Sequence, residues 1–424
     1  MMDILMINVH SSCNAGDAAL TQVTIEQLKK QFPGCRLTIA MDDPRSHFGD
    51  EVAIYSFFGW VKKEGKWGLW ELCQLLPGTL VPVLTFRFLG KPFWGLTPMN
   101  WRSLLEAYIH ADLVISKPGG FLYSSGRGLS LLVALYSLVF ALMAAKPVYI
   151  FPQSIGPLSR WWECVLVRWV LQRVRVIMVR EAISINQLRA CGFSVARCYL
   201  VPDVAFSYQA APIESALDWL GPYEVRKDNK PLLGMTVINW GAQDSSFRSQ
   251  DDYESSCAAA ARFFVENMHG KVFFFPQVWG PLEVQDDRVA ARRIVQRLSA
   301  VTESIFLVEE PLPPDLLKSI YGLMDVFIGT RMHSNIFALS QNVPVIAISY
   351  QPKTQGIAEM VGIGDWCVNI TEVTPQVLVE KLQSLWESRN QVRAQLAQII
   401  PLLVKRAEQA VIIVAADFFN NTNK

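Results

Sequence analysis

The chain has 424 residues and carries 39 Lys and Arg against 38 Asp and Glu, a formal net charge of +1. This length exceeds one ordinary hydrophobic core and predicts two domains of roughly 200 residues each. The balanced charge, without a long basic run, argues against a nucleic-acid partner, and scarce His with no Cys-x-x-Cys pair among eight Cys argues against a metal site.

The scattered cysteines are typical of buried thiols in a reducing cytoplasm. Residues 3–9 are apolar and no basic segment precedes them, so the start is interpreted as a buried strand rather than a signal peptide. We therefore expect a cytoplasmic protein, with peripheral contact at the inner face of the cell membrane as an open alternative.

Strands and helices alternate through the first half, which predicts a doubly wound parallel sheet in a domain spanning 1–207. The expected strands are 3–9, 35–41, 112–116, 147–151, 175–180 and 197–201. The expected helices are 17–31, 101–110, 129–145, 158–173 and 181–191. Residues 42–100 have an irregular pattern and are predicted to hold an insertion.

Two apolar stretches in this half raise the question of membrane contact. Residues 129–145 form an uncharged run close to transmembrane length. We interpret it as a buried central helix, because it leads directly into the strand at 147–151. The stretch 67–95 is rich in Trp, Leu and Phe, with Lys and Arg nearby. It fits either an insertion packed on the domain or a segment that enters a bilayer surface.

Residues 208–230 are rich in proline and charge and are interpreted as a linker to a second alternating domain, 231–424. Its expected strands are 232–238, 271–276, 304–308, 325–329 and 343–348. Its expected helices are 251–268, 284–298, 313–323, 332–341 and 353–361, followed by a helical region over 374–416. The predicted class is α/β, with two Rossmann-like parallel-sheet domains facing across a cleft in a GT-B-like architecture.

The most informative motif is Gly329-Thr330-Arg331-Met332-His333-Ser334, which lies between a predicted strand and a predicted helix. Ligands of open α/β sheets bind at such strand ends, and a helix N-terminus favours anions. The Arg331 guanidinium fits a phosphate or carboxylate, and His333 can transfer a proton near neutral pH. This pattern indicates a small anionic substrate beside an acid–base group.

Other strand ends carry weaker signals. Asn14, Gly16 and Asp17 follow the first strand, where Asn14 and Gly16 suit a turn and Asp17 can cap the helix. Gly119 and Gly120 allow close backbone approach but lack the spacing of a dinucleotide site. Gln153 and Ser154 can hydrogen-bond sugar hydroxyls, and Asp203 is either a turn residue or a base.

Taken together, these strand ends resemble the polysaccharide pyruvyl transferase family over roughly residues 3–365. The matching elements are Asn14-x-Gly16-Asp17, Gly119-Gly120, Gln153-Ser154-Ile155-Gly156-Pro157, Arg180-Glu181-x-x-Ser184, Pro202-Asp203, Gly329-Thr330-Arg331-Met332-His333-Ser334 and Ser349-Tyr350-x-x-Lys353. The resemblance implies a GT-B-like fold. It also implies transfer of a pyruvyl group from phosphoenolpyruvate to sugar hydroxyls of a polysaccharide or its lipid-linked precursor, with release of phosphate.

On this reading the second domain binds the donor and the first binds the acceptor. Catalysis is assigned to His333, with Asp17 or Asp203 as base, and no metal or other cofactor is expected. The predicted donor ligands are Arg331, Met332, Lys353 and Arg248, and the predicted acceptor ligands are Asn14, Gly16, Gly119, Gly120, Gln153 and Ser154. Arg248 is included because the first strand of the second domain lacks the arginine that often follows it in the family.

Two other functions stay open at this point. A nucleotide-sugar glycosyltransferase of the same fold would use Arg331 and Lys353 on a diphosphate. Alternatively, the missing arginine could mark a degenerate member that binds glycan without turnover. Retention of both Arg331 and His333 favours an active pyruvyl transferase.

Overall fold

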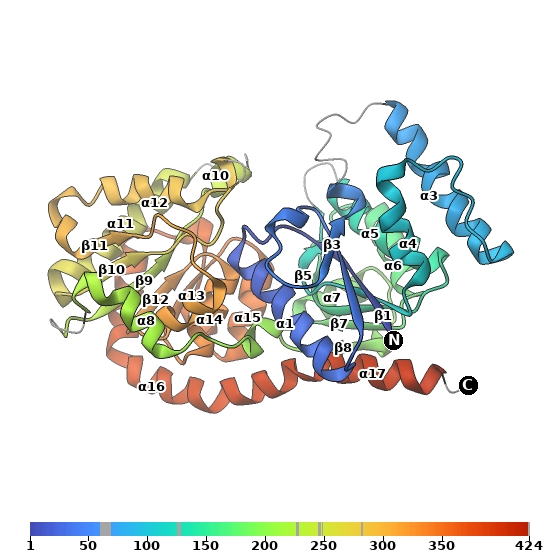
Figure 1. The fold of residues 1–424 in the computed structure, drawn as a ribbon. Coiled ribbons are helices and arrows are strands. Elements are labelled where there is room, and N and C mark those ends of the chain that lie inside the picture. Colours follow the sequence, from blue (N-terminus) through green and yellow to red (C-terminus); the bar gives the residue numbers. More distant parts are fainter. Residues whose placement is uncertain are drawn as a thin grey trace. The chain divides into compact units, whose positions relative to one another are not determined.

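The chain forms two compact units in a computed structural model that describes residues 1–59, 69–124, 129–225, 229–244, 247, 249–280 and 283–422 (Figure 1). The first unit comprises Met1–Ser12, Leu20–Val204 and Arg406–Lys424. The second comprises Cys13–Ala19 and Ala205–Lys405. The sequence predicts two continuous domains, 1–207 and 231–424. In the structure, Cys13–Ala19 belongs to the second unit and Arg406–Lys424 belongs to the first.

The first unit is built on a parallel sheet. Its strands are β1 (Asp3–Val9), β2 (Arg36–Met41), β3 (Val52–Tyr55), β4 (Leu113–Ser116), β5 (Gly119–Leu122), β6 (Val148–Ile155), β7 (Val176–Val179) and β8 (Cys198–Leu200). They run in the order β3-β2-β1-β4-β6-β7-β8, and β5 pairs with β6 beside this path. The order reverses between β1 and β4, as in doubly wound folds.

Helices cover the sheet of the first unit. They are α1 (Ala15–Gln31), α3 (Leu69–Leu89), α4 (Arg102–His110), α5 (Leu129–Met143), α6 (Trp161–Leu171), α7 (Ala182–Ala190) and α17 (Gln409–Thr422). The apolar run predicted as a central helix is α5, and its Leu135, Leu138 and Phe140 are buried in the core. Within the described residues, none of the helices has the length and apolarity needed to span a membrane.

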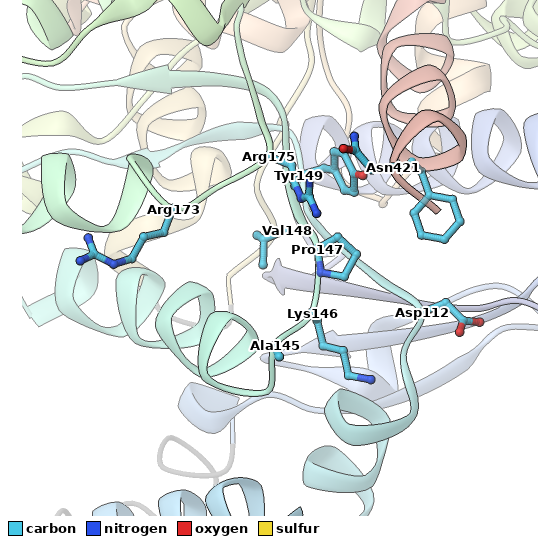
Figure 2. Close-up of a pocket in the computed structure, with 10 residues that line it drawn as sticks. Asp112, Ala145, Lys146, Pro147, Val148, Tyr149, Arg173, Arg175 and Asn421 are labelled. Atoms are coloured by element: carbon cyan, nitrogen blue, oxygen red, sulfur yellow. The ribbon is translucent and has the colours of Figure 1, made fainter. Parts of the chain in front are cut away.

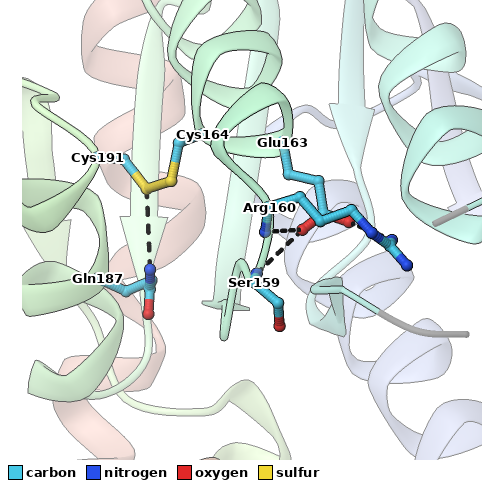
Figure 3. Close-up of a disulfide and its surroundings, with 6 residues drawn as sticks. All are labelled: Ser159, Arg160, Glu163, Cys164, Gln187 and Cys191. Atoms are coloured by element: carbon cyan, nitrogen blue, oxygen red, sulfur yellow. Dashed lines mark hydrogen bonds and ion pairs between the residues drawn. A yellow bond between two sulfur atoms is a disulfide. The ribbon is translucent and has the colours of Figure 1, made fainter. Parts of the chain in front are cut away.

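Two cysteines depart from the expectation of free thiols. Cys164 on α6 and Cys191 at the end of α7 form a disulfide, with Cα atoms 5.1 Å apart (Figure 3). The two cysteines are 27 residues apart, on α6 and at the end of α7, so their pairing depends on the packing of these helices and could not be predicted from local pattern. The start of α6 is fixed nearby, where the backbone amides of Ser159 and Arg160 each donate to a Glu163 carboxylate oxygen over 3.0 Å.

The second unit also has a parallel sheet whose strand order reverses near its centre. Its strands are β9 (Leu232–Thr236), β10 (Lys271–Phe274), β11 (Ile305–Leu307), β12 (Val326–Gly329), β13 (Val345–Ser349) and β14 (Cys367–Asn369). Its helices are α8 (Ile213–Leu220), α10 (Trp240–Gln243), α11 (Gln250–Met268), α12 (Asp287–Gln296), α13 (Pro314–Tyr321), α14 (Met332–Ser340), α15 (Pro352–Val361) and α16 (Pro375–Ala407). The order β11-β10-β9-β12-β13-β14 reverses between β9 and β12.

Two segments with irregular patterns contain regular elements. The stretch expected to be a linker holds α8, which buries Ala216 and Leu220 and packs against α13. The helix has only eight residues and is flanked by proline and charged residues, so its apolar face is too short to be recognised from the sequence pattern. The predicted insertion at 42–100 holds β3 and α3, and β3 extends the first sheet beside β2.

Candidate functional site

The sheet of the second unit places its switch point beside the Arg331 motif. Strand order reverses between β9 and β12, and ligands of open α/β sheets bind at the carboxyl ends of strands that flank such a reversal. β12 ends at Gly329, so Arg331 and His333 follow directly at that edge. Arg331 is the N-cap of α14, and His333 lies in the first turn of this helix.

The turn between β12 and α14 is fixed by buried hydrogen bonds. The Asn335 side-chain amide donates to the Gly329 carbonyl over 3.0 Å, and a Cβ at position 329 would collide with the Asn335 side chain. The Thr330 amide donates to the Thr236 carbonyl over 3.0 Å. The Ser334 hydroxyl donates to the Arg331 carbonyl over 2.6 Å. Because these groups are buried and paired, the backbone at Arg331 is held in one conformation.

Asp287 holds the Arg331 guanidinium. Arg331 Nε lies 3.2 and 3.1 Å from the two Asp287 carboxylate oxygens, and a terminal nitrogen lies 2.6 Å from one of them. Asp287 is buried and also accepts from the backbone amides of Gln277 and Val278, each over 3.1 Å. This geometry orients the guanidinium through a bidentate pair. Asp287 could not be predicted from local sequence pattern, because its partner Arg331 lies 44 residues away.

Arg331 stays charged in this setting. Burial lowers its pKa, but the Asp287 carboxylate and the Tyr350 hydroxyl raise it more, so the net shift is upward. The Arg331 side chain keeps 13% of its surface exposed. The Tyr350 ring in turn contacts the Trp240 ring, with centroids 4.7 Å apart. Tyr350 directly follows β13 and Trp240 follows β9, so an aromatic pair from two strand ends lies beside the Arg331 guanidinium.

His333 packs directly against Gly16. A Cβ built on Gly16 would lie 2.2 Å from His333 Nδ1 and 2.5 Å from Cγ, distances that no real side chain tolerates. Only glycine at position 16 leaves the imidazole its place. Both residues belong to the second unit, which includes Cys13–Ala19. The structure therefore brings together two predicted site residues that are more than 300 positions apart in the sequence.

Asn14, rather than Asp17, caps α1. The Asn14 side-chain oxygen accepts from the amides of Gly16 and Asp17 over 3.0 and 3.3 Å, and its carbonyl accepts from Ala18 over 2.9 Å. The predicted cap at Asp17 is wrong because the helix begins two residues earlier, at Ala15. The Ala15 amide donates to the Gln277 carbonyl over 3.0 Å, beside the amides that bind Asp287. Asp17 lies half-buried in the first turn.

The remaining predicted donor residues have different environments. Met332 is buried at the first position of α14, so its contribution to a ligand would come from the backbone amide. Lys353 is half-buried in the first turn of α15, which follows β13, the neighbour of β12. The starts of α14 and α15 thus share one edge of the sheet. Arg248 lies outside the described residues.

The predicted acceptor residues of the first unit lie in a buried polar network. Ser154 accepts from Arg180 Nε over 2.6 Å and donates to Glu181 over 3.0 Å. Arg180 also pairs with Asp203 over 2.5 Å, and both side chains are fully buried. Burial raises the pKa of Glu181, against the opposing effect of Arg180. Gln153 is also fully buried, and none of these five residues is more than 5% exposed.

Gly119 and Gly120 begin β5. Gly119 has φ of +149°, a conformation that side chains rarely adopt, which explains a glycine there. It pairs with Gln153 across the sheet. Gly119 is buried and Gly120 is half-buried. The glycine pair therefore has a backbone role beside the buried network.

A pocket of about 470 Å³ opens at the opposite edge of the first sheet (Figure 2). Its lining includes Asp112, Pro147 and Arg175, each directly before a strand. Figure 2 shows the Lys146 and Arg173 side chains pointing in different directions rather than toward one centre. Because ligands of such sheets bind at carboxyl ends, this amino-end pocket does not fit a substrate site. In the described part of the chain, no group of three His, Cys, Asp or Glu side chains is arranged to hold a metal ion.

Comparisons with known proteins place the chain in a family. The family model described as polysaccharide pyruvyl transferase matches residues 14–352. The amylovoran biosynthesis protein AmsJ of Erwinia amylovora is 21% identical over 410 residues, covering 94% of this chain and 95% of that protein. The range matched by the family model contains Asn14, Gly16, Arg331 and His333 and ends one residue before Lys353.

Solved structures share the fold. A putative UDP-N-acetylglucosamine 2-epimerase from Listeria monocytogenes superimposes with a TM-score of 0.58 at 12% identity, covering 97% of this chain and 94% of that one. Anabaena HepE, solved with UDP-glucose, gives a TM-score of 0.56 at 13% identity over 100% of both chains. This likeness establishes a GT-B-like class with two parallel-sheet α/β domains. On the family match, the chain belongs to the polysaccharide pyruvyl transferases and is a transferase of polysaccharide biosynthesis.

Proposed function

We propose that this protein transfers a pyruvyl group from phosphoenolpyruvate to two hydroxyls of a sugar in a polysaccharide or its lipid-linked precursor. The products are a pyruvate ketal and inorganic phosphate. The observation that carries the proposal is the Arg331-x-His333 pair at the start of α14, located at the switch point of the second sheet, with the imidazole packed on Gly16.

The donor has a carboxylate and a phosphate on a three-carbon frame, so its site needs converging positive groups. Arg331 supplies a cation that Asp287 fixes in direction. The amides at the start of α14 add a partial positive charge. Lys353 in the first turn of α15 supplies a second cation at the same sheet edge. Two cations and a helix N-terminus match the two anionic groups of the donor.

The reaction begins when His333, as imidazolium, transfers its proton to the methylene carbon of the donor. The second carbon becomes oxocarbenium-like, and a sugar hydroxyl adds to it while a base takes the hydroxyl proton. Phosphate then leaves with the electrons of its bond to that carbon. A neighbouring sugar hydroxyl forms the second C–O bond and gives its proton to the neutral His333 imidazole, which completes the ketal and restores the imidazolium.

Asp17 is the better candidate for the base. It follows Gly16, whose backbone contacts the imidazole, and it is half-buried at the start of α1. Asp203 is fully buried in its ion pair with Arg180. Removal of a proton from a sugar would require Asp203 to leave that pair, which is costly for a buried charge.

The test is phosphate release from phosphoenolpyruvate with a panel of simple and lipid-linked glycosides. We expect acceptor-dependent release by the wild type and a loss of about 100-fold or more in His333→Ala, because general acid catalysis contributes factors of this size. Arg331→Lys should raise the donor concentration needed for saturation, since an ammonium cannot reproduce the bidentate fork. His110→Ala, at an exposed histidine on α4, is the matched control.

Three results would contradict the proposal. Full turnover by His333→Ala would remove the acid role. Transfer from a nucleotide sugar, with phosphoenolpyruvate inert and giving no thermal stabilisation, would identify a glycosyltransferase instead. Donor binding without turnover on any acceptor would favour a non-catalytic member.

A further inference from the structure

The helix α3 of the first unit is apolar on the side that faces solvent. Leu76, Leu84 and Phe88 lie on this outer side at multiples of four residues, and all are exposed. Leu89 ends the helix, and the segment that follows adds Phe93 and Met99. The exposed fractions reach 75% for Phe88 and Leu89 and 81% for Met99. We call these six residues the α3 surface. A solvent-facing helix normally carries polar residues on such a face.

The inner side of the same helix is anchored, so the outer side chains cannot turn inward. Val83 is buried in the core of the first unit. The Thr79 hydroxyl lies 2.6 Å from the Tyr136 hydroxyl of α5. Figure 1 shows α3 beside α4 and at the margin of its own unit. A helix that is apolar on both sides, with only one of them covered, indicates a further contact on the other.

The turn after α3 is also well defined. The Gly90 amide donates to the Phe86 carbonyl over 2.9 Å, and the Phe93 amide donates to the Thr85 hydroxyl over 2.8 Å. The Thr97 hydroxyl donates to the Gly78 carbonyl over 2.8 Å, tying the far end of the segment back to the helix. Exposure of Phe88, Leu89 and Phe93 is therefore a property of a hydrogen-bonded structure.

The charges around the α3 surface select the kind of partner. Residues 76–105 contain Arg87, Lys91 and Arg102 and no Asp or Glu. The Arg87 guanidinium lies 5.8 Å from the Phe88 ring centroid and donates to the Met143 carbonyl over 3.1 Å. The exposed Glu106 lies just beyond this range, on α4. Aromatic and aliphatic residues with cations in the same segment match the interface of an anionic bilayer, where rings enter the acyl boundary and cations meet phosphate headgroups.

We propose that the α3 surface binds the protein to an anionic lipid bilayer. Phe88, Leu89 and Phe93 enter the acyl boundary, and Arg87 and Lys91 contact headgroups. This inference deepens the proposed function, because a membrane-bound protein reaches a lipid-linked saccharide by diffusion along the bilayer. Vesicle binding needs no turnover, so it can fail or succeed independently of pyruvyl transfer.

The test is sedimentation of the full chain with vesicles of phosphatidylcholine alone or mixed with phosphatidylglycerol. We expect binding to the anionic vesicles, weakened by added salt. The triple variant Phe88→Ser, Leu89→Ser, Phe93→Ser should lower the vesicle-bound fraction at least tenfold. Lys91→Glu should lower it several-fold on anionic vesicles. The control replaces three exposed apolar residues of the second unit by serine: Ile213, Val284 and Leu402.

Several outcomes would overturn the proposal. One is a wild type that stays in the supernatant with anionic vesicles. Another is a triple variant that binds as well as the wild type, or a control that loses binding equally. If the wild type self-associates through this surface and the triple variant becomes monomeric while neither binds vesicles, a second copy covers the helix instead. Phosphate release with a simple glycoside should be equal in wild type and triple variant.

Discussion

Gly16 is the residue whose identity is most tightly constrained by the candidate site. Its Cα packs on the His333 imidazole, and its amide donates to the Asn14 side chain that caps α1. One residue therefore combines a helix start with the position of the proposed acid. The sequence suggested a tight turn here, but a turn alone does not require contact with a residue 317 positions later. The close approach makes the glycine a requirement of the site.

The first prediction concerns this contact. Gly16→Ala should lower acceptor-dependent phosphate release by about 10- to 100-fold, because His333 must move from a geometry needed for proton transfer. The free energy of unfolding should also fall by about 1–3 kcal/mol, because the new Cβ overlaps atoms of the half-buried His333 side chain, including its Cβ, and overpacking of this kind has that cost. Gly221→Ala, where a Cβ would meet no atom within 4 Å, is the control. Wild-type activity of Gly16→Ala would show that the contact has no role in positioning His333.

At the same scale, the sequence predicted some site residues better than others. Arg331 and His333 follow a recognisable strand, so their position at its end could be inferred from local pattern. Asp287 could not, because it reaches Arg331 through the fold and lies at the start of another helix. Asp203 was placed after the correct strand, but its burial against Arg180 depends on neighbouring elements. Local pattern locates strand ends, and packing decides which side chains are accessible.

At the scale of elements, α13 fixes the start of the second unit. Lys318 on this helix is buried and donates to the carbonyls of Ala205, Phe206 and Tyr208 over 3.3, 3.4 and 2.5 Å. The Ala211 amide donates to the Asp315 carbonyl over 3.0 Å. Residues 205–211, where the chain enters the unit, are thus held by one helix. Burial lowers the pKa of Lys318 to about 7.

This burial predicts a dependence of stability on pH. An unfolded lysine keeps its proton up to about pH 10, whereas the folded form releases it near pH 7, so the unfolded state binds more protons between these values. Stability relative to Lys318→Met should therefore rise with pH, by about 2 kcal/mol between pH 7 and 9. Urea unfolding of both proteins across this range measures the difference. A difference that stays constant would show that the three carbonyls keep the ammonium charged in the fold.

At the scale of the whole molecule, the sequence predicted the class of both sheets but not the assignment of segments to units. Alternating strands and helices indicate parallel α/β architecture wherever they occur. The C-terminal helical region reads as one element over 374–416 because both of its parts are amphipathic. The structure divides it into α16 and α17 and assigns Arg406–Lys424 to the first unit. The C-terminal segment joins the first unit through contacts with residues far away in the sequence, and local pattern does not predict such contacts.

Those contacts are specific to α17. The Tyr149 hydroxyl on β6 donates to the Asp417 carboxylate over 2.9 Å. Phe418 and Phe419 contact the Phe32 ring, with centroids 6.5 and 5.8 Å apart. Val414 is fully buried, whereas Ile412 on the same helix is exposed. The last helix of the chain therefore completes the core of the unit that contains the first strand.

The last prediction uses this matched pair on α17. Val414→Ala should reduce the free energy of unfolding of the first unit by roughly 2 kcal/mol, because it removes buried methyl groups and leaves a cavity. Ile412→Ala should change it by less than about 0.5 kcal/mol, as expected for an exposed position. Amide hydrogen exchange locates the effect: β6 and β7, which α17 contacts, should lose protection in Val414→Ala, while β12 and β13 of the second unit keep theirs. Loss of protection in β12 and β13 with none in β6 and β7 would place α17 in the energetics of the second unit and contradict the division of the chain seen here.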